Sequence, residues 1–283
     1  HLVLHPCPLF GVLTQFGLRH VSPLSGAAIS IPTFTLVFIC ASPILLRNET
    51  IVWSAVPIFM AVGLAFPAVV TLLTFASNRA LGPVVTSSLG NLSPLFAVTL
   101  AVVLLHEPLR PLQFAGLVVV VAGVLAISVQ RYGARDWRTL AHQNWALLLP
   151  LGAAALRGLV PPVIKLGLDL WPSPIAAGLV GYIMSTVTVV TVEKIRNGSF
   201  IAKASRTGRL WFMGIGLCNG LATMLLYAAL GAGPVSLVVP LIATFPLFTV
   251  VLSVIAFGRL ENGFRLAGGT VLTVAGVVLI LIG

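Results

Sequence analysis

The stretch SPLFAVTLAVVLL at residues 93–105 has a close counterpart in FPLFTVVLSVIAF at residues 245–257, 152 positions later. Recurrence at a fixed spacing is the sequence signature of a duplicated structural unit. The chain is therefore predicted to contain two repeats, residues 1–130 and 145–283, joined by an inter-repeat loop at 131–144. Three further pairs recur in the same order: AGLVVVVAGVL (115–125) with GGTVLTVAGVV (268–278), NRALGPV (78–84) with YAALGAGPV (227–235), and QFGL (15–18) with KLGL (165–168).

The composition indicates a protein that lies in lipid. Hydrophobic residues make up 58% of the 283 residues and charged residues only 8%, whereas a soluble domain carries about 25% charged residues. The net charge of +10 comes from 16 Lys and Arg against six acids. These basic residues are scattered between apolar runs, whereas a nucleic-acid-binding face would cluster them on a polar surface. A lipid bilayer is therefore the expected partner, and nucleic acid is not.

Ten apolar segments approach the length of about 20 residues that a membrane-crossing helix needs. They lack the alternation of a membrane β-strand, so helices are expected. The predicted fold class is an all-α polytopic membrane protein with ten transmembrane helices. The expected spans are 2–18, 24–46, 52–76, 81–105, 112–130, 145–168, 174–192, 210–230, 234–257 and 264–282.

Five spans per repeat place the second repeat in the membrane with the opposite orientation. Inverted five-helix repeats around a central cavity are typical of secondary transporters. The loop charges agree, because the loops after odd-numbered spans hold twelve Lys and Arg and the others hold Arg47 and Arg110. The positive-inside rule then predicts cytoplasmic odd-numbered loops and both termini outside.

Motifs for catalysis, metal binding and cofactor binding are missing from the sequence. It contains no HExxH, no P-loop and no nucleophile elbow, so hydrolysis and ATP-driven transport have no support. Cys7, Cys40 and Cys218 lie in apolar runs without the spacing of a metal site. We therefore predict no cofactor, no metal and no enzymatic activity. The opening HLVLHPCPLF has no charged leader with a cleavage site, and we interpret it as part of the first span.

A charged residue stands in the middle of the sixth span, within AALRGLVPPVIKLG (154–167). An arginine near the bilayer centre costs at least about 2.5–3.5 kcal/mol. All six acids are expected in loops, so no carboxylate in a span is available to pair with Arg157. It then either lines a wet cavity and binds a carboxylate or phosphate of the solute, or binds backbone carbonyls that helix breaks have freed. Lys165 lies near a helix end, from which it can reach the interface.

Prolines are expected to kink or break several spans, because each removes a backbone donor. Such breaks either expose backbone groups that bind solute or only bend helices for packing. Besides the pair Pro161–Pro162, these prolines are Pro32, Pro57, Pro67, Pro94, Pro240 and Pro246.

Polar side chains within the spans are the candidates for binding a small-molecule solute. Each is equally suited to hydrogen-bonding between helices, which contributes about 0.6 kcal/mol. Because no acid is expected in a span, the cavity should be neutral to positive and should favour a carboxylated or zwitterionic solute over a bare cation. The candidates are Arg157, Lys165, Gln15, Asn78, Ser88, Asn91, Tyr182, Asn219, Tyr227 and Thr244.

Each repeat carries PLF followed by an apolar run and a GxxxxxxGV motif, starting at Gly116 and at Gly269. With its five spans per repeat, the whole chain resembles the EamA-type carriers of the drug/metabolite transporter superfamily, most closely the bacterial amino-acid and metabolite exporters of the YddG type. Glu107 in LLHEPL stands at the family's glutamate, whereas the second repeat has Arg259 there. Lys165 in LRGLVPPVIK stands at the family's lysine.

At the repeat openings, Arg157 stands where the family usually has a tryptophan. In the first repeat Cys7 and Gln15 take the positions of Arg157 and Lys165.

The resemblance implies a secondary transporter of the bacterial inner membrane that exports amino acids or related carboxylated metabolites by alternating access. It also implies cytoplasmic termini, opposite to the loop charges. Three alternatives stay open: exchange of phosphorylated metabolites with Arg157 holding the phosphate, export of drugs or cations, and an intramembrane enzyme. The sequence does not fix the oligomeric state.

Overall fold

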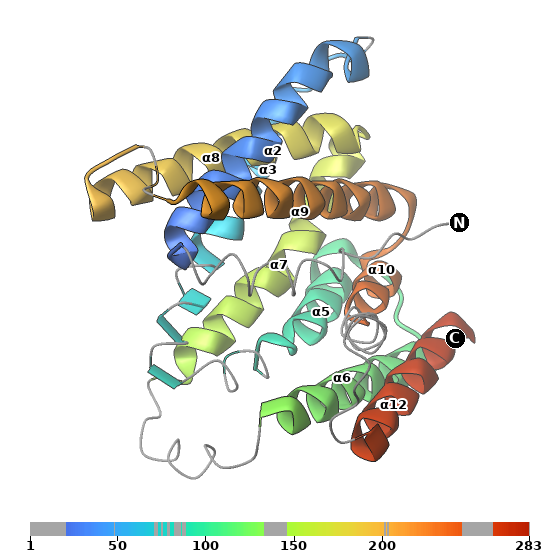
Figure 1. The fold of residues 1–283 in the computed structure, drawn as a ribbon. Helices are drawn as coiled ribbons and strands as arrows, with labels where there is room; N and C mark the ends of the chain where they lie inside the picture. The colour runs from blue at the N-terminus through green and yellow to red at the C-terminus, as the bar shows by residue number, and fades with distance from the viewer. Residues whose placement is uncertain are drawn as a thin grey trace. The chain divides into compact units, whose positions relative to one another are not determined.

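The structure is a computed structural model of the chain. It describes residues 21–47, 49–70, 73–74, 76–77, 80–81, 86, 89–132, 146–200, 202, 204–244 and 263–282, and every regular element among them is a helix (Figure 1). The contacts divide the chain into two compact units. The first unit comprises His1–Ala68 and Val163–Ala232, and the second comprises Val69–Pro162 and Gly233–Gly283. Each unit therefore combines a segment from each half of the sequence.

The first unit is built mainly from three long helices. Two of them begin with a serine that caps the helix and a proline in its first turn: α2 (Pro23–Leu45) after Ser22 and α8 (Pro174–Asn197) after Ser173. Serine accepts a hydrogen bond from a free N–H at a helix start, and proline has none to leave unpaired. The unit also contains α3 (Val56–Gly63), most of the π-helix η1 (Leu64–Val69), the end of α7 (Leu148–Leu170) and α9 (Arg206–Ala232).

Small residues bring α2 and α9 close together, and α2 packs on both α8 and α9 (Figure 1). A Cβ atom on Gly216 would overlap the backbone of Ser30, and one on Gly220 would overlap the ring of Phe34. Both glycines therefore serve helix packing, as is usual in membrane proteins, where apolar side chains give little drive for helices to associate.

The second unit contains α5 (Ser93–Leu105), α6 (Pro111–Tyr132), the first part of α7, α10 (Val235–Ile242) and α12 (Gly263–Ile282). Within it, α6 and α12 run side by side (Figure 1). A Cβ atom on Gly276 would lie 2.6 Å from Val120 N and 2.7 Å from Gly116 O. Glycine thus permits backbone contact between these two helices.

Four of the described helices are long and apolar enough to cross a membrane: Leu24–Leu45, Leu148–Leu170, Pro174–Asn197 and Arg206–Ala232. They coincide with the predicted spans 24–46, 145–168, 174–192 and 210–230. Shorter apolar helices fall within other predicted spans, whereas span 2–18 lies outside the described residues. The described part of the chain thus supports an all-helical, multi-pass membrane protein.

Two predicted spans are not continuous helices, and the interruption at Pro67 was expected from the proline. In 52–76, α3 gives way to η1, where Phe66 takes the extended values φ −129° and ψ 129°. In 81–105, α5 begins only at Ser93, after a turn at Asn91 and Leu92. Phe66 directly precedes Pro67, and a residue before proline is biased towards extended backbone. Pro94 is instead the second residue of α5, where a proline suits the start of a helix.

The prolines do not all act as predicted. Pro57 and Pro94 lie in the first turns of α3 and α5, where a missing donor costs nothing. Pro161 and Pro162 lie inside α7, which continues through them as one helix. Pro32 and Pro240 are likewise inside α2 and α10. Pro246 lies outside the described residues.

The prediction that all six acids lie in loops is wrong for two of them. Asp169 is in the last turn of α7, and Glu193 is in the last turns of α8, where it is buried. The predicted spans ended at residues 168 and 192, whereas α7 continues to Leu170 and α8 to Asn197, so both helices include these acids. The apolar run alone placed each boundary too early, because a helix continues for as long as its backbone is paired.

Candidate functional site

Arg157 lies nine residues after the start of α7, at Leu148, and its side chain is exposed. Among the residues that the structure describes, its guanidinium forms no hydrogen bond or ion pair. The neighbouring Gly158 fixes its position, because a Cβ atom there would lie 2.5 Å from Phe96 Cβ and 2.7 Å from Ser93 O. Within the second unit, α7 is thus held close to the start of α5 at the turn that carries Arg157.

The proline pair changes the backbone at the same turn. In an α-helix the N–H of residue i+4 binds the carbonyl of residue i. Pro161 and Pro162 have no N–H, so the carbonyls of Arg157 and Gly158 lose their helical donors. One turn of α7 therefore carries a cationic donor and two backbone acceptors without helical partners.

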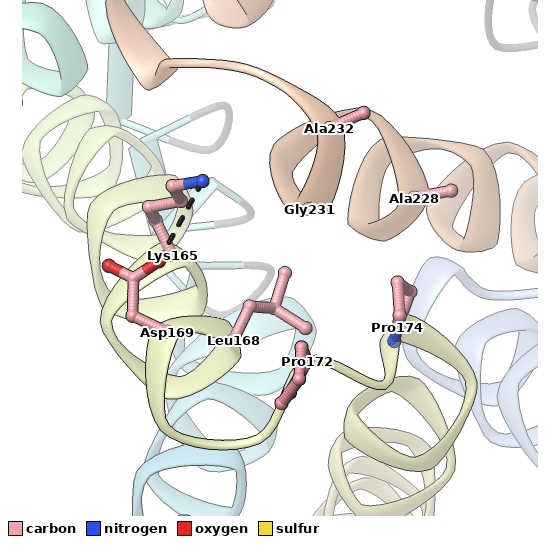
Figure 2. A pocket seen from close by; sticks show the side chains of 8 residues that line it. All are labelled: Lys165, Leu168, Asp169, Pro172, Pro174, Ala228, Gly231 and Ala232. Atoms are coloured by element: carbon pink, nitrogen blue, oxygen red, sulfur yellow. Dashed lines mark ion pairs between the residues drawn. The ribbon is translucent and has the colours of Figure 1, made fainter.

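Lys165 lies at a small pocket in the first unit (Figure 2). Its Nζ donates to Leu230 O at 3.0 Å and lies 3.7 Å from Asp169 Oδ1. A cation at this place stabilises the C-terminal end of α9, where carbonyls lack partners. The pocket has a volume of about 220 Å³ and is lined by Lys165, Leu168, Asp169, Pro172, Pro174, Ala228, Gly231 and Ala232.

Of the predicted polar lining, the structure brings two tyrosines together in the first unit. Tyr182 on α8 and Tyr227 on α9 are 9% and 4% exposed, and a Cβ atom on Gly181 would lie 3.1 Å from the Tyr227 hydroxyl. The Tyr182 ring packs against Phe34 with centroids 5.0 Å apart. Half-buried Asn219 also lies on α9. Both tyrosines are thus part of the packed interior of this unit.

Two other predicted residues belong to the second unit. Asn91 is half-buried in the turn before α5. Thr244 is buried after α10, and its hydroxyl donates to Leu241 O at 2.7 Å. Gln15, Asn78 and Ser88 lie outside the described residues.

Sequence reasoning gave Glu107 no structural role, yet it caps a helix. Its Oε1 accepts from Val235 N at 2.8 Å and its Oε2 from Ser236 N at 2.9 Å, at the first two residues of α10. A carboxylate at a helix N-terminus pairs free N–H groups and complements the helix dipole. The sequence contains one indication of this role. Gly233 and Pro234 precede α10, and neither has a side chain that can cap the helix, so the cap must come from another segment.

Sequence reasoning also missed Glu193, which is 1% exposed. Its Oε1 accepts hydrogen bonds from Ser25 Oγ and Asn197 Nδ2, both at 2.8 Å, and its Oε2 has no partner. The signal within α8 was the i,i+4 pair of Glu193 and Asn197 on one helix face. The contact with Ser25, 168 positions away, has no local signal.

Among the described residues, no group of three or more His, Cys, Asp or Glu could hold a metal ion. Within that part of the chain Cys40 and Cys218 form no disulfide, and Cys7 lies outside it. Where the structure describes the chain, the polar chemistry thus consists of Arg157, the Lys165 pocket and two carboxylates that bind neighbouring helices.

Comparison with known proteins gives a family match along most of the chain. The sequence matches the EamA-like transporter family over residues 9–129 and 144–282. Its fold is similar to a solved structure titled "Crystal structure of protein", with a TM-score of 0.77 and 18% identity, over 97% of this chain and 93% of the other. No curated protein matches the sequence. These matches do not distinguish YddG-type exporters from other members of the family.

Proposed function

Because the chain belongs to the EamA-like transporter family, within the drug/metabolite transporter superfamily, we propose that it exports amino acids or related small carboxylated metabolites, as exporters of the YddG type do. It is a secondary transporter that works by alternating access in a bacterial inner membrane. Its partners are the bilayer and a small-molecule substrate, and it needs no cofactor.

The observation that carries this proposal is the guanidinium of Arg157 on an apolar helix, without a hydrogen-bond or ion-pair partner among the described residues. An arginine in mid-membrane is stable only where it meets water or a polar partner, because transfer into acyl chains costs at least about 2.5–3.5 kcal/mol. No described residue supplies that partner. A carboxylate of the solute fits, because guanidinium and carboxylate form two parallel hydrogen bonds.

The same turn supports a zwitterion in particular. The carbonyls of Arg157 and Gly158 lack helical donors because of Pro161 and Pro162. An ammonium group is a donor with no acceptor of its own, so it suits free carbonyls beside a guanidinium that holds the carboxylate.

A counterflow assay in proteoliposomes tests the substrate class. Vesicles that contain the purified protein are loaded with unlabelled solute, and uptake of the same labelled solute is followed. Amino acids should accelerate exchange over protein-free vesicles, and sugar phosphates should not. Exchange of sugar phosphates alone would instead support the phosphate exchanger, and formation of a chemical product from the solute would support an enzyme.

A further inference from the structure

Glu193 combines burial with an incomplete set of hydrogen bonds. It lies four residues before the end of α8 at Asn197, which corresponds to about 6 Å of helix. The residue is 1% exposed, and its Oε2 has no hydrogen-bond partner in the part of the chain that the structure describes. An ionised carboxylate removed from water with one bare oxygen is costly, and a bound proton removes its charge.

The other carboxylate oxygen is held by donors from two helices. Ser25 Oγ, in the first turn of α2, and Asn197 Nδ2, on α8, both donate to Oε1 at 2.8 Å. Ser22 Oγ in turn donates to Ser25 Oγ at 2.9 Å. These bonds fix the carboxyl in one orientation and leave Oε2 as the oxygen that can bind a proton.

Among the charged groups that the structure describes, none neutralises Glu193. On α8, Lys194 and Arg196 are exposed, and on α9, Arg206 and Arg209 are exposed as well. None of these four forms an ion pair with Glu193, nor does any other basic residue that the structure describes. On α2, the neighbours are the hydroxyls of Ser22 and Ser25, which do not titrate in this range.

We propose that Glu193, held by Ser25 and Asn197, is a proton-binding site that couples this protein to a pH gradient. In the binding step, hydronium transfers its proton to Oε2 and leaves as water, and the carboxylate becomes a carboxylic acid. In the release step, water takes the same proton from Oε2. A metal cation fits less well, because the groups around Oε1 point hydrogens at the carboxylate.

The proton site and its coupling are separate claims. Proton binding by Glu193 stands on the geometry alone. Coupling to solute movement rests on the proposed transport function, because a proton can drive a solute only in a protein that moves one. Glu193 on α8 accepts a hydrogen bond from Ser25 on α2, so a proton that binds to Glu193 changes the strength of a contact between these two helices.

Infrared difference spectroscopy tests proton binding without any solute. Purified protein in lipid, with carbon-13 in its glutamate carboxyls, is titrated from acidic to alkaline pH. Besides the bands of solvent-exposed glutamates, we expect a separate protonated-carboxyl band, at the higher frequency of a carboxyl removed from water, that shows the isotope shift and disappears as the pH rises. Glu193→Gln should lose the band, because its amide preserves the acceptor for Ser25 and Asn197 but binds no proton.

The matched control is Glu49→Gln, which removes an exposed acid from the segment after α2. It should keep the titrating band. A band that survives unchanged in Glu193→Gln, or no titrating glutamate band in the wild type, overturns the proton site. If Glu193→Gln does not fold, Glu193→Asp with labelled aspartate should transfer the isotope shift to the new residue, and its failure to do so has the same meaning.

The transport arm separates this proposal from the proposed function. In proteoliposomes, a pH gradient should accelerate amino-acid uptake in the wild type and in Glu49→Gln. In Glu193→Gln this acceleration should be lost while counterflow without a gradient continues. Acceleration that persists in Glu193→Gln overturns the coupling. Failure of counterflow in every variant overturns the proposed function and leaves the infrared result to decide on the proton site.

Discussion

At the residue scale, Arg157 is the clearest link from sequence to function. An arginine within an apolar run can be recognised from the sequence alone. It indicates a polar environment, because burying a guanidinium among acyl chains is costly. Its exposure and its lack of a partner among the described residues could not be predicted, because they depend on how α7 packs at Gly158.

Arg157→Ala should lower amino-acid counterflow about 10- to 100-fold, because a hydrogen bond to a charged group contributes about 1.5–3 kcal/mol. Arg157→Lys should retain part of the activity, because it keeps the charge but not the two parallel bonds. Arg209→Ala, which removes an exposed arginine from the first turn of α9, is the control and should transport normally. Normal counterflow in folded Arg157→Ala would rule out this residue as the substrate anchor.

Glu107 gives a second prediction at this scale, and it concerns stability. Glu107→Gln should lower the free energy of unfolding by about 1–2 kcal/mol, because one charged acceptor is lost at the start of α10. Unfolding in mixed micelles measures this loss. Glu49→Gln, an exposed acid without such contacts, should leave stability unchanged. Equal stability of the two variants would contradict the capping role.

Glu193 shows where sequence reasoning stops at this scale. The apolar run ends at residue 192, so the next residue looked like part of a loop. Its burial comes from the start of α2, which lies 168 positions earlier in the chain. Nothing local indicates such a contact, and the inference that no acid lies within a helix failed for that reason.

At the element scale, the long helices could be predicted, whereas the prolines showed only some of the places where a helix is interrupted. Length and hydropathy suffice for α2, α7, α8 and α9, because about 20 apolar residues have few alternatives in a membrane. Proline signals an irregularity, but its effect depends on its position. At Pro94 it starts a helix, and at Pro161 the helix continues through it. The surrounding packing decides between these outcomes.

The contact between α6 and α12 predicts the effect of adding one methyl group. Gly276→Ala should destabilise the protein by about 1–3 kcal/mol, because its Cβ atom would meet backbone atoms of Val120 and Gly116. Gly268→Ala on the same helix meets nothing within 4 Å and should be neutral or slightly stabilising. Unfolding in mixed micelles again gives the measurement, and equal effects would contradict the close packing.

At the scale of the whole molecule, the orientation of the chain is still a prediction. The loop charges favour cytoplasmic odd-numbered loops, and the family resemblance favours cytoplasmic termini. In a variant with Cys7, Cys40 and Cys218 replaced by serine, Phe200→Cys should react with an impermeant thiol reagent only from the cytoplasmic side. Glu49→Cys should react only from outside. The reverse pattern would support the orientation that the family implies.

The sequence predicts two internal repeats, but it does not indicate how the helices group. The spacing of 152 residues divides the chain into halves. The contacts instead group His1–Ala68 with Val163–Ala232, and Val69–Pro162 with Gly233–Gly283. Similarity between segments reveals duplication, whereas contacts depend on which apolar faces cover each other, and sequence similarity carries no information about that.

This interleaving has a consequence for how the protein could be divided. A gene cut within the segment 131–144 would yield two polypeptides, each with half of the helices of either unit. Produced alone, each polypeptide should be degraded by the membrane quality-control proteases, because the helix surfaces that normally pack against the other polypeptide remain uncovered. Produced together in one cell, the two fragments should complement each other and restore activity, even though no peptide bond joins them.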